Sequence, residues 1–338
     1  MNNLTLYRAR FVLPITTPLI EDGAVLVESA VIRAIGNYRE LSAAHPEATV
    51  VDFGESTLLP PMVNAHTHLE LSSFAGWAIA AGEPDAPQSF VDWILWLVRV
   101  RRSVTEEQLR DSLVDGLQTS LLAGTGAIGD ISTTLGCVSA YQKSPLRGRV
   151  FAEVLGHDLA MVAERLTEIE NAVKIPPGES MNWGLSPHAP YTLSATAADQ
   201  VFAFADRQKL QCSIHLAEST DETHLLQNGS GAIAEKLYAA AKWNPTVDLA
   251  AGSSPVQEFC RQGRLRAGDL LVHGVQVDAA DIDLIGDTGC PVVLCPRSNA
   301  ALNVGKAPVA SYLKVGVPLA LGTDSLASSP SLSIWDEV

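Results

Sequence analysis

The sequence of 338 residues predicts an α/β protein, a (β/α)8 barrel of the TIM type preceded by a small N-terminal β-sandwich domain. Three observations predict this class. The first 60 residues alternate short apolar and polar runs around turn signals, and the remainder alternates apolar strands with helix-like stretches. Several of the later strands end in histidine or a carboxylate. The length suits a barrel of roughly 250 residues with one smaller unit.

Residues 1–60 have the pattern of short strands. Apolar stretches lie at 4–7, 24–27 and 31–36, and Asp22-Gly23 precedes the second of them as a turn signal. We expect a β-sandwich here that is incomplete without further strands from a C-terminal region. Residues 61–338 are expected to form the catalytic barrel, cut off just after its eighth strand.

Residues 61–338 repeat a strand followed by a helix. A first strand ends at His66, and seven strand-like segments follow at 126–131, 148–155, 182–188, 211–215, 269–273, 290–295 and 318–324. Helix-like stretches with polar faces lie at 105–122, 159–173, 195–209 and 233–242. Eight such units predict a barrel, a fold in which the chemistry gathers at the C-terminal ends of the strands.

The composition limits the partners of the protein. Acidic residues exceed basic ones, 38 against 23, and the net charge of −15 argues against nucleic acid, which requires clustered Lys and Arg. The five cysteines are odd in number and widely spaced, as expected for buried thiols in a reducing compartment. No apolar run is long enough for a membrane helix, and residues 1–4 do not show the basic region and apolar core typical of a signal peptide. We therefore expect a cytoplasmic protein whose partner is a small-molecule substrate.

His66 and His68 form an H-x-H motif at the end of the first barrel strand. Residues two apart on a strand share a face, so both imidazoles can reach one ion. Other strands end in His215, His273 and Asp324. Imidazole and carboxylate groups together suit Zn, Fe or Mn. A metal site is therefore predicted at this end of the barrel.

The order and spacing of these motifs resemble the amidohydrolase superfamily, in the branch that holds aminohydrolases of purines, pyrimidines and triazines. The resemblance covers nearly the whole chain. It is carried by the stretch 60–70, by Ser186-Pro187-His188-Ala189-Pro190-Tyr191, by His215 with Glu218, by His273, by Cys295-Pro296-Arg297-Ser298-Asn299 and by Gly322-Thr323-Asp324.

The resemblance implies one divalent metal ion, most readily zinc, with iron or manganese as alternatives. Its ligands would be His66, His68, His215 and Asp324. Asp324 would also accept a proton from the attacking water, Glu218 would protonate a ring nitrogen of the substrate, and His273 would orient the water. Two of these residues also have a plainer explanation. Glu218 could be a carboxylate at the start of a helix, and His273 could be a core histidine. No lysine ends the third or fourth strand to bridge a second metal, which favours one ion.

Five residues are expected to contact the substrate. His188 matches a fourth-strand histidine that touches substrate in relatives acting on adenosine-like compounds, although a structural role is open for it. Arg297 and Asn299 lie in a loop position after the seventh strand. Trp93 and Arg102 lie in the segment 89–102, which is expected to be a helix near the barrel mouth; its aromatic residues could equally belong to the core.

The same segment bears on the choice of substrate. In methylthioadenosine and adenosylhomocysteine deaminases this helix carries a carboxylate for the ribose hydroxyls, whereas here it carries Arg99, Arg101 and Arg102. Arginines there would suit a substrate carboxylate. This segment, together with residues 68–72, is more similar to the aminofutalosine deaminases.

The function that these observations predict is hydrolytic deamination of an amino-substituted heteroaromatic ring, in particular at the adenine 6-position of a nucleoside-like molecule. Metal-activated water could also displace chloride or an alkylamine from a triazine, or open a cyclic amide, because pocket contacts decide the leaving group. A barrel that binds a ligand without catalysis is the alternative from another class. A homodimer is expected from the behaviour of relatives.

Overall fold

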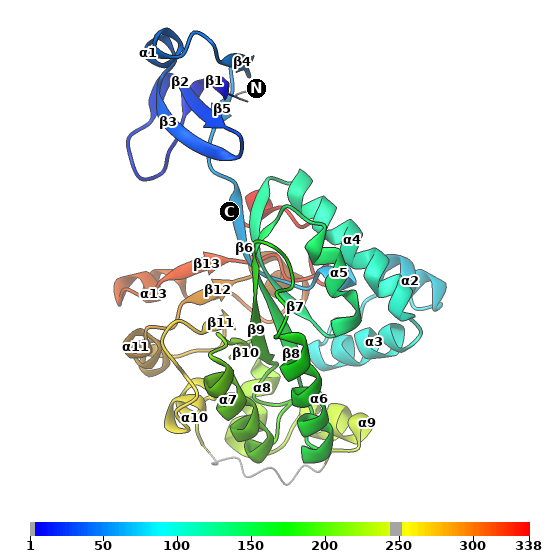
Figure 1. The fold of residues 1–338 in the computed structure, drawn as a ribbon. Helices are drawn as coiled ribbons and strands as arrows, with labels where there is room; N and C mark the ends of the chain where they lie inside the picture. The colour runs from blue at the N-terminus through cyan, green and yellow to red at the C-terminus, as the bar shows by residue number, and fades with distance from the viewer. Residues whose placement is uncertain (1–3, 244–251) are drawn as a thin grey trace. The chain divides into compact units, whose positions relative to one another are not determined.

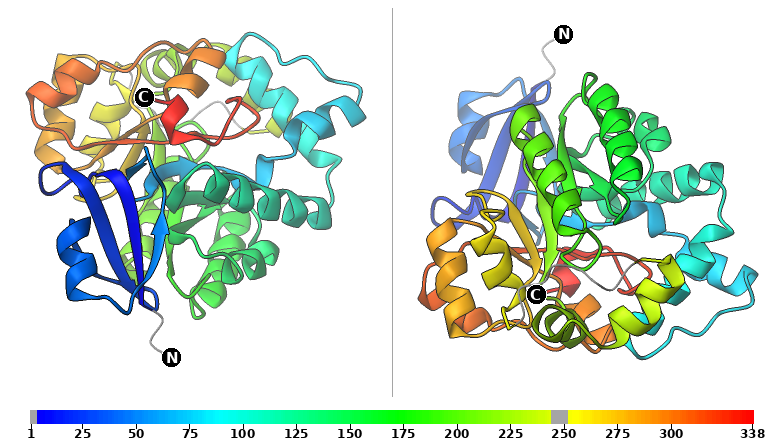
Figure 2. Two further views of the ribbon diagram at one scale, coloured as in Figure 1. Left: turned by 90° about the horizontal axis from the view of Figure 1, so that it is seen from above. Right: turned by 90° about the horizontal axis from the view of Figure 1, so that it is seen from below.

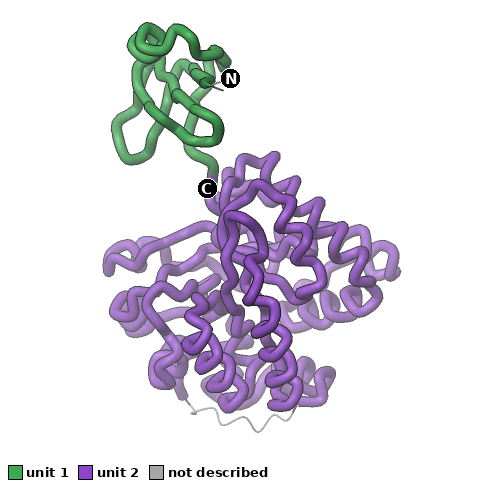
Figure 3. The backbone as a smooth tube through the Cα atoms, in the orientation of Figure 1, with its two compact units in different colours: residues 1–61 green, residues 62–338 purple. Residues whose placement is uncertain are grey.

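The structure, a computed structural model, describes residues 4–243 and 252–338 (Figure 1). The chain divides into two compact units, Met1–Pro61 and Met62–Val338 (Figure 3). The division lies one residue beyond the expected end of the N-terminal domain.

The N-terminal unit contains one mixed sheet and one helix. Its elements are β1 (Leu4–Val12), β2 (Ile20–Glu28), β3 (Val31–Asn37), α1 (Tyr38–Ala44), β4 (Thr49–Asp52) and β5 (Thr57–Leu58). The sheet order is β3-β2-β1-β4, and β5 pairs with the end of β1. Leu6 and Leu26 on the sheet pack against Leu41 of α1. The described residues of this unit thus form one sheet with a helix on its apolar face, and the sandwich that further strands would complete stays a prediction.

The second unit contains eight parallel strands. They are β6 (Met62–Thr67), β7 (Thr125–Ser132), β8 (Arg147–Val154), β9 (Met181–Pro187), β10 (Ser213–Leu216), β11 (Leu270–His273), β12 (Val292–Leu294) and β13 (Leu319–Leu321). Each overlaps a strand that the sequence predicts. They pair as two four-stranded sheets, β6 to β9 and β10 to β13.

Single parallel bridges join the two sheets on both sides. Leu185 pairs with Cys212 between β9 and β10, and Thr67 pairs with Asp324 between β6 and the end of β13. The eight strands thus follow one another in sequence order around a barrel. Figure 2 shows these strands at the centre of the unit with helices outside them.

Helices follow the strands and cover the barrel from outside. They are α2 (Phe74–Ala80), α3 (Phe90–Arg102), α4 (Glu106–Leu122), α5 (Val138–Gln142), α6 (Leu159–Ala172), α7 (Ala195–Gln208), α8 (Thr220–Asn228), α9 (Ala239–Ala241), α10 (Pro255–Arg261), α11 (Ala279–Thr288), α12 (Pro296–Ala301) and α13 (Val309–Lys314). Short 3-10 helices lie at η1 (Leu69–Leu71), η2 (Leu135–Cys137) and η4 (Ile334–Asp336). The predicted helix 233–242 is a π-helix, η3 (Ile233–Tyr238), followed by the single turn α9.

Local sequence explains where the longer helices start. Thr105 begins α4 with a capping box, in which its side chain accepts from the backbone of Gln108 and the Gln108 side chain accepts in return. The hydroxyl of Ser89 caps α3 at the backbone of Asp92. All five cysteines are free thiols, and every one except Cys260 is buried. Within the described residues, no helix is long and apolar enough to cross a bilayer.

Gly322 allows the last strand to approach the first. A Cβ atom placed there would lie 2.8 Å from both Cβ and the carbonyl oxygen of His66. We expect Gly322→Ala to lower the free energy of unfolding by about 1–3 kcal/mol, because the seam between β13 and β6 must open to accept the methyl group. Denaturant unfolding measures this, with Gly76→Ala on α2 as the control because its added methyl meets nothing within 4 Å. Equal midpoints for the two variants would contradict the expectation.

Candidate active site at the C-terminal ends of the barrel strands

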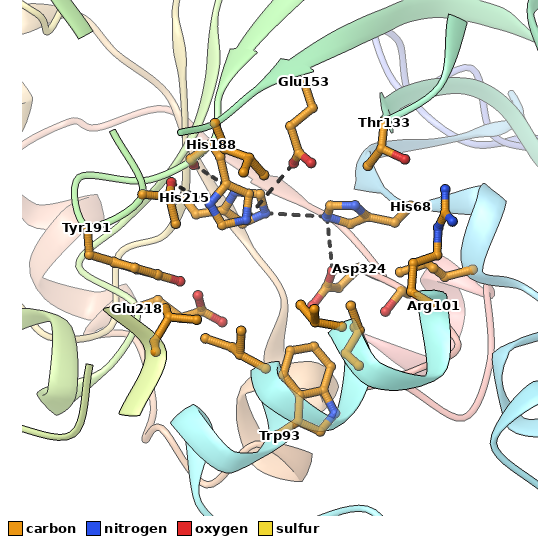
Figure 4. A pocket seen from close by; sticks show the side chains of 18 of the residues that line it. His68, Trp93, Arg101, Thr133, Glu153, His188, Tyr191, His215, Glu218 and Asp324 are labelled. Atoms are coloured by element: carbon orange, nitrogen blue, oxygen red, sulfur yellow. Dashed lines mark hydrogen bonds and ion pairs between the residues drawn. The ribbon is translucent and has the colours of Figure 1, made fainter. Parts of the chain in front are cut away.

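A cavity of about 400 Å³ lies at the C-terminal ends of the barrel strands (Figure 4). Strand-end residues line it on the barrel side: His68, Glu153, His188, His215, His273 and Asp324. Helix α3 lines it with Trp93, Ile94, Leu97, Val98, Arg101 and Arg102. Trp93 and Arg102, which are predicted to contact substrate, thus both line the cavity.

Three imidazoles and one carboxylate converge at the floor of this cavity. Oδ1 of Asp324 lies 3.6 Å from Nε2 of His66 and 3.6 Å from Nε2 of His68. Nε2 of His68 lies 3.3 Å from Nε2 of His215. His66 is fully buried, and neither of its ring nitrogens has a hydrogen-bond partner in residues 4–243 and 252–338. This donor set fits a divalent cation, which would give the buried nitrogen of His66 a ligand bond.

Neighbouring groups fix the orientation of these four side chains. Nδ1 of His215 donates to the carbonyl oxygen of His188 (2.9 Å), which leaves Nε2 of His215 facing the centre. Oδ2 of Asp324 accepts from the hydroxyl groups of Ser298 (2.5 Å) and Ser328 (2.9 Å). Oδ1 of Asp324 thus remains available for a ligand.

The protonation states also suit ligation. Burial lowers the pKa of His68 to about 3, with His66 adding to the effect, and burial lowers the pKa of His66 and, strongly, of His215. Burial would raise the pKa of Asp324, but its hydrogen bond to His66 and the other nearby imidazoles hold that pKa well below its usual value. Neutral imidazoles and an ionised carboxylate are the forms that bind metals.

Glu218 and His273 face each other beside this group. Oε1 of Glu218 lies 3.5 Å from Nε2 of His273, and both side chains are buried. Burial, and then the charge of Asp324, raise the pKa of Glu218 well above its usual value, which favours the protonated form that a proton donor requires. Glu222 accepts from the backbone N–H groups of Ala217 (3.0 Å) and Glu218 (2.8 Å) and so positions Glu218.

Three residues around the site have left-handed backbone conformations. The φ angles are 54° at Ala217, 77° at His273 and 58° at Asp324. Such conformations cost side-chain-bearing residues on the order of 1–3 kcal/mol each and persist only where the surroundings hold them. The strand ends are thus bent at the positions that present His273 and Asp324.

Asn299, predicted to contact substrate, instead holds His273. It is buried in α12 and does not line the cavity. Its Oδ1 accepts a hydrogen bond from Nδ1 of His273 (2.9 Å). This contact keeps Nε2 of His273 turned toward Glu218, so Asn299 is a positioning residue.

Asn299→Ala is expected to lower kcat by roughly 10- to 100-fold, because it leaves the buried N–H of His273 unsatisfied, at a cost of about 1–3 kcal/mol. Asn299→Asp keeps an acceptor at that position and should retain kcat within about 10-fold of the parent. Steady-state kinetics with metal analysis of both variants checks this. Equal losses in the two variants would show that Asn299 acts only through packing.

Arg297 also lies outside the cavity lining, in contrast to the prediction. Its Nη1 donates to Ser331 (3.0 Å) and lies 3.1 Å from Asp336, and its backbone N–H donates to Glu337 (3.0 Å). The side chain is engaged with the C-terminal segment because α12 begins at Pro296 and turns this residue away from the cavity. The structure gives no support for a substrate contact by Arg297.

His188 lies at the cavity wall as predicted. Nδ1 of His188 is 3.0 Å from the hydroxyl of Thr192, and Nε2 is 4.0 Å from Oε1 of Glu153. Burial, with the charges of His66 and His273, lowers the pKa of His188 to about 4, so its ring is neutral at pH 7. Its carbonyl supports His215 and its ring faces the cavity.

Several residues that line the cavity have no role predicted from the sequence, among them Glu70, Thr133, Glu153, Tyr191 and Trp243. Glu153 could have been found by the rule that identified the histidines, because it stands near the end of a predicted strand. Trp243 gave no such signal, since nothing in its local sequence places it at the barrel mouth.

Comparison with known proteins places the chain in a family. The amidohydrolase family profile matches residues 57–338, and an imidazolonepropionase-like composite domain of bacteria matches residues 23–48. The aminodeoxyfutalosine deaminase of Deinococcus radiodurans is 31% identical over 94% of this chain and 75% of its own length. The 5-methylthioadenosine/S-adenosylhomocysteine deaminase of Nitratidesulfovibrio vulgaris is 28% identical over 95% of this chain and 67% of its own length.

A solved structure agrees with these relatives. The crystal structure of Helicobacter pylori aminofutalosine deaminase with methylthio-coformycin has a TM-score of 0.83 and 25% identity, over 98% of this chain and 80% of that one. The predicted resemblance and the barrel fold are both confirmed. The chain belongs to the amidohydrolase family, whose members are metal-dependent hydrolases.

Proposed function

We propose that this protein is a hydrolytic deaminase that replaces the 6-amino group of an adenine ring by oxygen and releases ammonia. Its substrate is a nucleoside-like small molecule of the aminofutalosine, methylthioadenosine or adenosylhomocysteine type. One observation carries the proposal: Glu218 faces His273 in the cavity that His68, His215 and Asp324 line, with His66 buried beside them. The deaminase names of the relatives in three bacteria support it.

Four side chains would hold one divalent cation. Zinc is preferred, because zinc sites in proteins typically have four ligands that include imidazole and carboxylate groups. The four side chains are His66, His68, His215 and Asp324. When bound, the cation supplies a Lewis acid that makes water a nucleophile at neutral pH.

The protein side chains move the protons of the reaction. Glu218 donates its proton to a ring nitrogen, which makes the neighbouring carbon electrophilic. Asp324 accepts a proton from the attacking water, and His273 hydrogen-bonds the oxygen as the carbon becomes tetrahedral. Asp324 then passes its proton to the amino group, which leaves as ammonia. The hydroxyl proton of the tetrahedral centre returns to Glu218 as the C=O bond forms. The balance is one water consumed and one ammonia released.

Helix α3 bears on which nucleoside is preferred. Arg101 and Arg102 line the cavity, and within the described residues neither forms an ion pair with a carboxylate. Arg99, by contrast, pairs with Glu83 at 2.7 Å and lies outside the cavity lining. Two free guanidinium groups favour a substrate that carries a carboxylate, as aminofutalosine does, over one with a neutral thioether.

The test is ammonia release by metal-loaded protein on adenosine, methylthioadenosine, adenosylhomocysteine and aminofutalosine. We expect release that a chelator abolishes and zinc restores, with higher kcat/KM for the two compounds that carry a carboxylate, aminofutalosine and adenosylhomocysteine, than for adenosine and methylthioadenosine. Silence on all four, together with turnover of a triazine or a cyclic amide, would replace the proposal. Metal-replete protein that binds these compounds without turning them over would indicate a binding protein.

Location and assembly remain proposals. The free and mostly buried thiols support the cytoplasm as the location. A homodimer is a prediction that sedimentation of the full chain decides.

A further inference from the structure

Glu153 is a buried acid in the cavity that the proposed chemistry does not use. It lies near the end of β8, its side chain lines the cavity, and the residue is 8% exposed. Its Oε1 is buried and has no hydrogen-bond partner within residues 4–243 and 252–338. An unpartnered buried polar atom costs free energy unless something else satisfies it.

The other acids of the cavity differ from Glu153 in this respect. Both oxygens of Glu70 engage Thr133, through the backbone N–H (3.2 Å) and the hydroxyl. Asp324 accepts from Ser298 and Ser328, and Glu218 faces His273. Among the described acids that line the cavity, Glu153 is thus the one with a buried oxygen that has neither a hydrogen-bond partner nor a role in the proposed chemistry.

The position of Glu153 relates it to the reacting centre. Its Oε1 lies 4.0 Å from Nε2 of His188, and the ring of His188 lies next to that of His215, with 4.8 Å between the centroids. Figure 4 shows Glu153 above the imidazoles and Glu218 below them in that view. A ring whose nitrogen reaches Glu218 can therefore carry a substituent that approaches Glu153 and His188.

Hydroxyl groups match these two side chains best. Burial, together with the charge of Glu70, raises the pKa of Glu153 to about 8, so its carboxyl group can donate as well as accept near neutral pH. At this wall of the cavity, the acidic side chain of Glu70 would repel a substrate carboxylate. The α3 residues that line the opposite wall, all of them described, include no acid, so α3 offers no carboxyl group to a hydroxyl.

We propose that Glu153 and His188 bind vicinal hydroxyl groups on the substituent of the ring, such as those of a ribose. This inference rests on the proposed function and adds the part of the substrate that the deaminating residues do not touch. It assigns Glu153 as a specificity-determining residue, with the hydroxyl groups held at the β8 side of the cavity.

The test compares two substrates in three proteins. Adenosine and 2′,3′-dideoxyadenosine are assayed with the parent, with Glu153→Leu and with Glu164→Gln, an exposed change on α6 that serves as the control. We expect the parent to prefer adenosine by about 10- to 100-fold in kcat/KM, because a site built to bond a hydroxyl rejects the analogue without it. Glu153→Leu should lose that preference through slower turnover of adenosine, while its rate on the dideoxy compound stays within about 3-fold of the parent.

A second variant is the control for a loss of activity caused by misfolding of Glu153→Leu. Glu153→Gln keeps the shape and one acceptor, and should show an intermediate preference with an unchanged melting temperature. Equal loss on both substrates in Glu153→Leu and Glu153→Gln would overturn the inference. If the parent deaminates neither compound, calorimetric titration of the two compounds decides the role of Glu153, which equal affinities would overturn. The proposed function is tested separately by the panel of four nucleosides.

Discussion

Glu218→Gln is expected to lower kcat for ammonia release by about 10²- to 10⁴-fold, the range typical of removing a general acid. The glutamine side chain has the same shape but cannot give a proton to the ring nitrogen. The backbone at residue 218 should stay in place, because Glu222 still accepts from it. Stopped-time ammonia assays measure the loss of kcat, and metal analysis of the purified variant shows whether the metal site is intact.

The control for this change is Glu164→Gln, which makes the same substitution on the exposed face of α6 and should leave kcat unchanged. The metal content of Glu218→Gln should equal that of the parent, because Glu218 is not in the ligand group. A variant with parental kcat would rule out Glu218 as the proton donor.

Asp324→Asn is expected to lower both metal content and kcat, the latter by at least about 10³-fold, because one carboxylate serves as ligand and proton acceptor. The amide has no negative charge to face His66 and His68. Its nitrogen would also oppose the hydroxyl groups of Ser298 and Ser328 if it took the place of Oδ2. Mass spectrometry of bound metal, with kinetics at saturating zinc, separates the two losses.

Ser328→Ala provides a graded comparison. It removes one of the two hydroxyl groups that donate hydrogen bonds to Oδ2 of Asp324. Metal affinity or activity should fall about 10-fold, which is the smallest loss typical of residues that hydrogen-bond a metal ligand. Losses as large in Ser328→Ala as in Asp324→Asn would mean that the hydrogen bonds, rather than the charge, determine the metal site.

The parts of the site that lie on strands could be predicted from the sequence. His66, His68, His215 and Asp324 were identified because a parallel strand fixes which end of the barrel its last side chains reach. The same reasoning placed Glu218 and His273 near them. The eight strands overlap their predicted ranges because each is a short, largely apolar segment, although β13 is only half-buried.

The residues after the seventh strand could not be predicted in this way. Helix α12 begins directly at Pro296, and its turn directs Asn299 to His273 and Arg297 to the C-terminal segment. The pattern of residue types does not predict in which direction that turn points each side chain. The strand pattern of residues 1–60 predicted the N-terminal sheet but did not reveal that α1 packs on its apolar face; completion of a sandwich by further strands stays a prediction.

The left-handed conformations at Ala217, His273 and Asp324 have an evolutionary consequence. Glycine adopts such conformations without penalty, so glycine at position 273 or 324 would relax the backbone while removing an imidazole or a carboxylate. Selection for function opposes this drift, and selection for thermal stability alone would favour it. Descendants of this chain that have lost catalysis should therefore accumulate glycine or asparagine at these positions first. Those substitutions would mark lineages that keep the barrel fold without the activity.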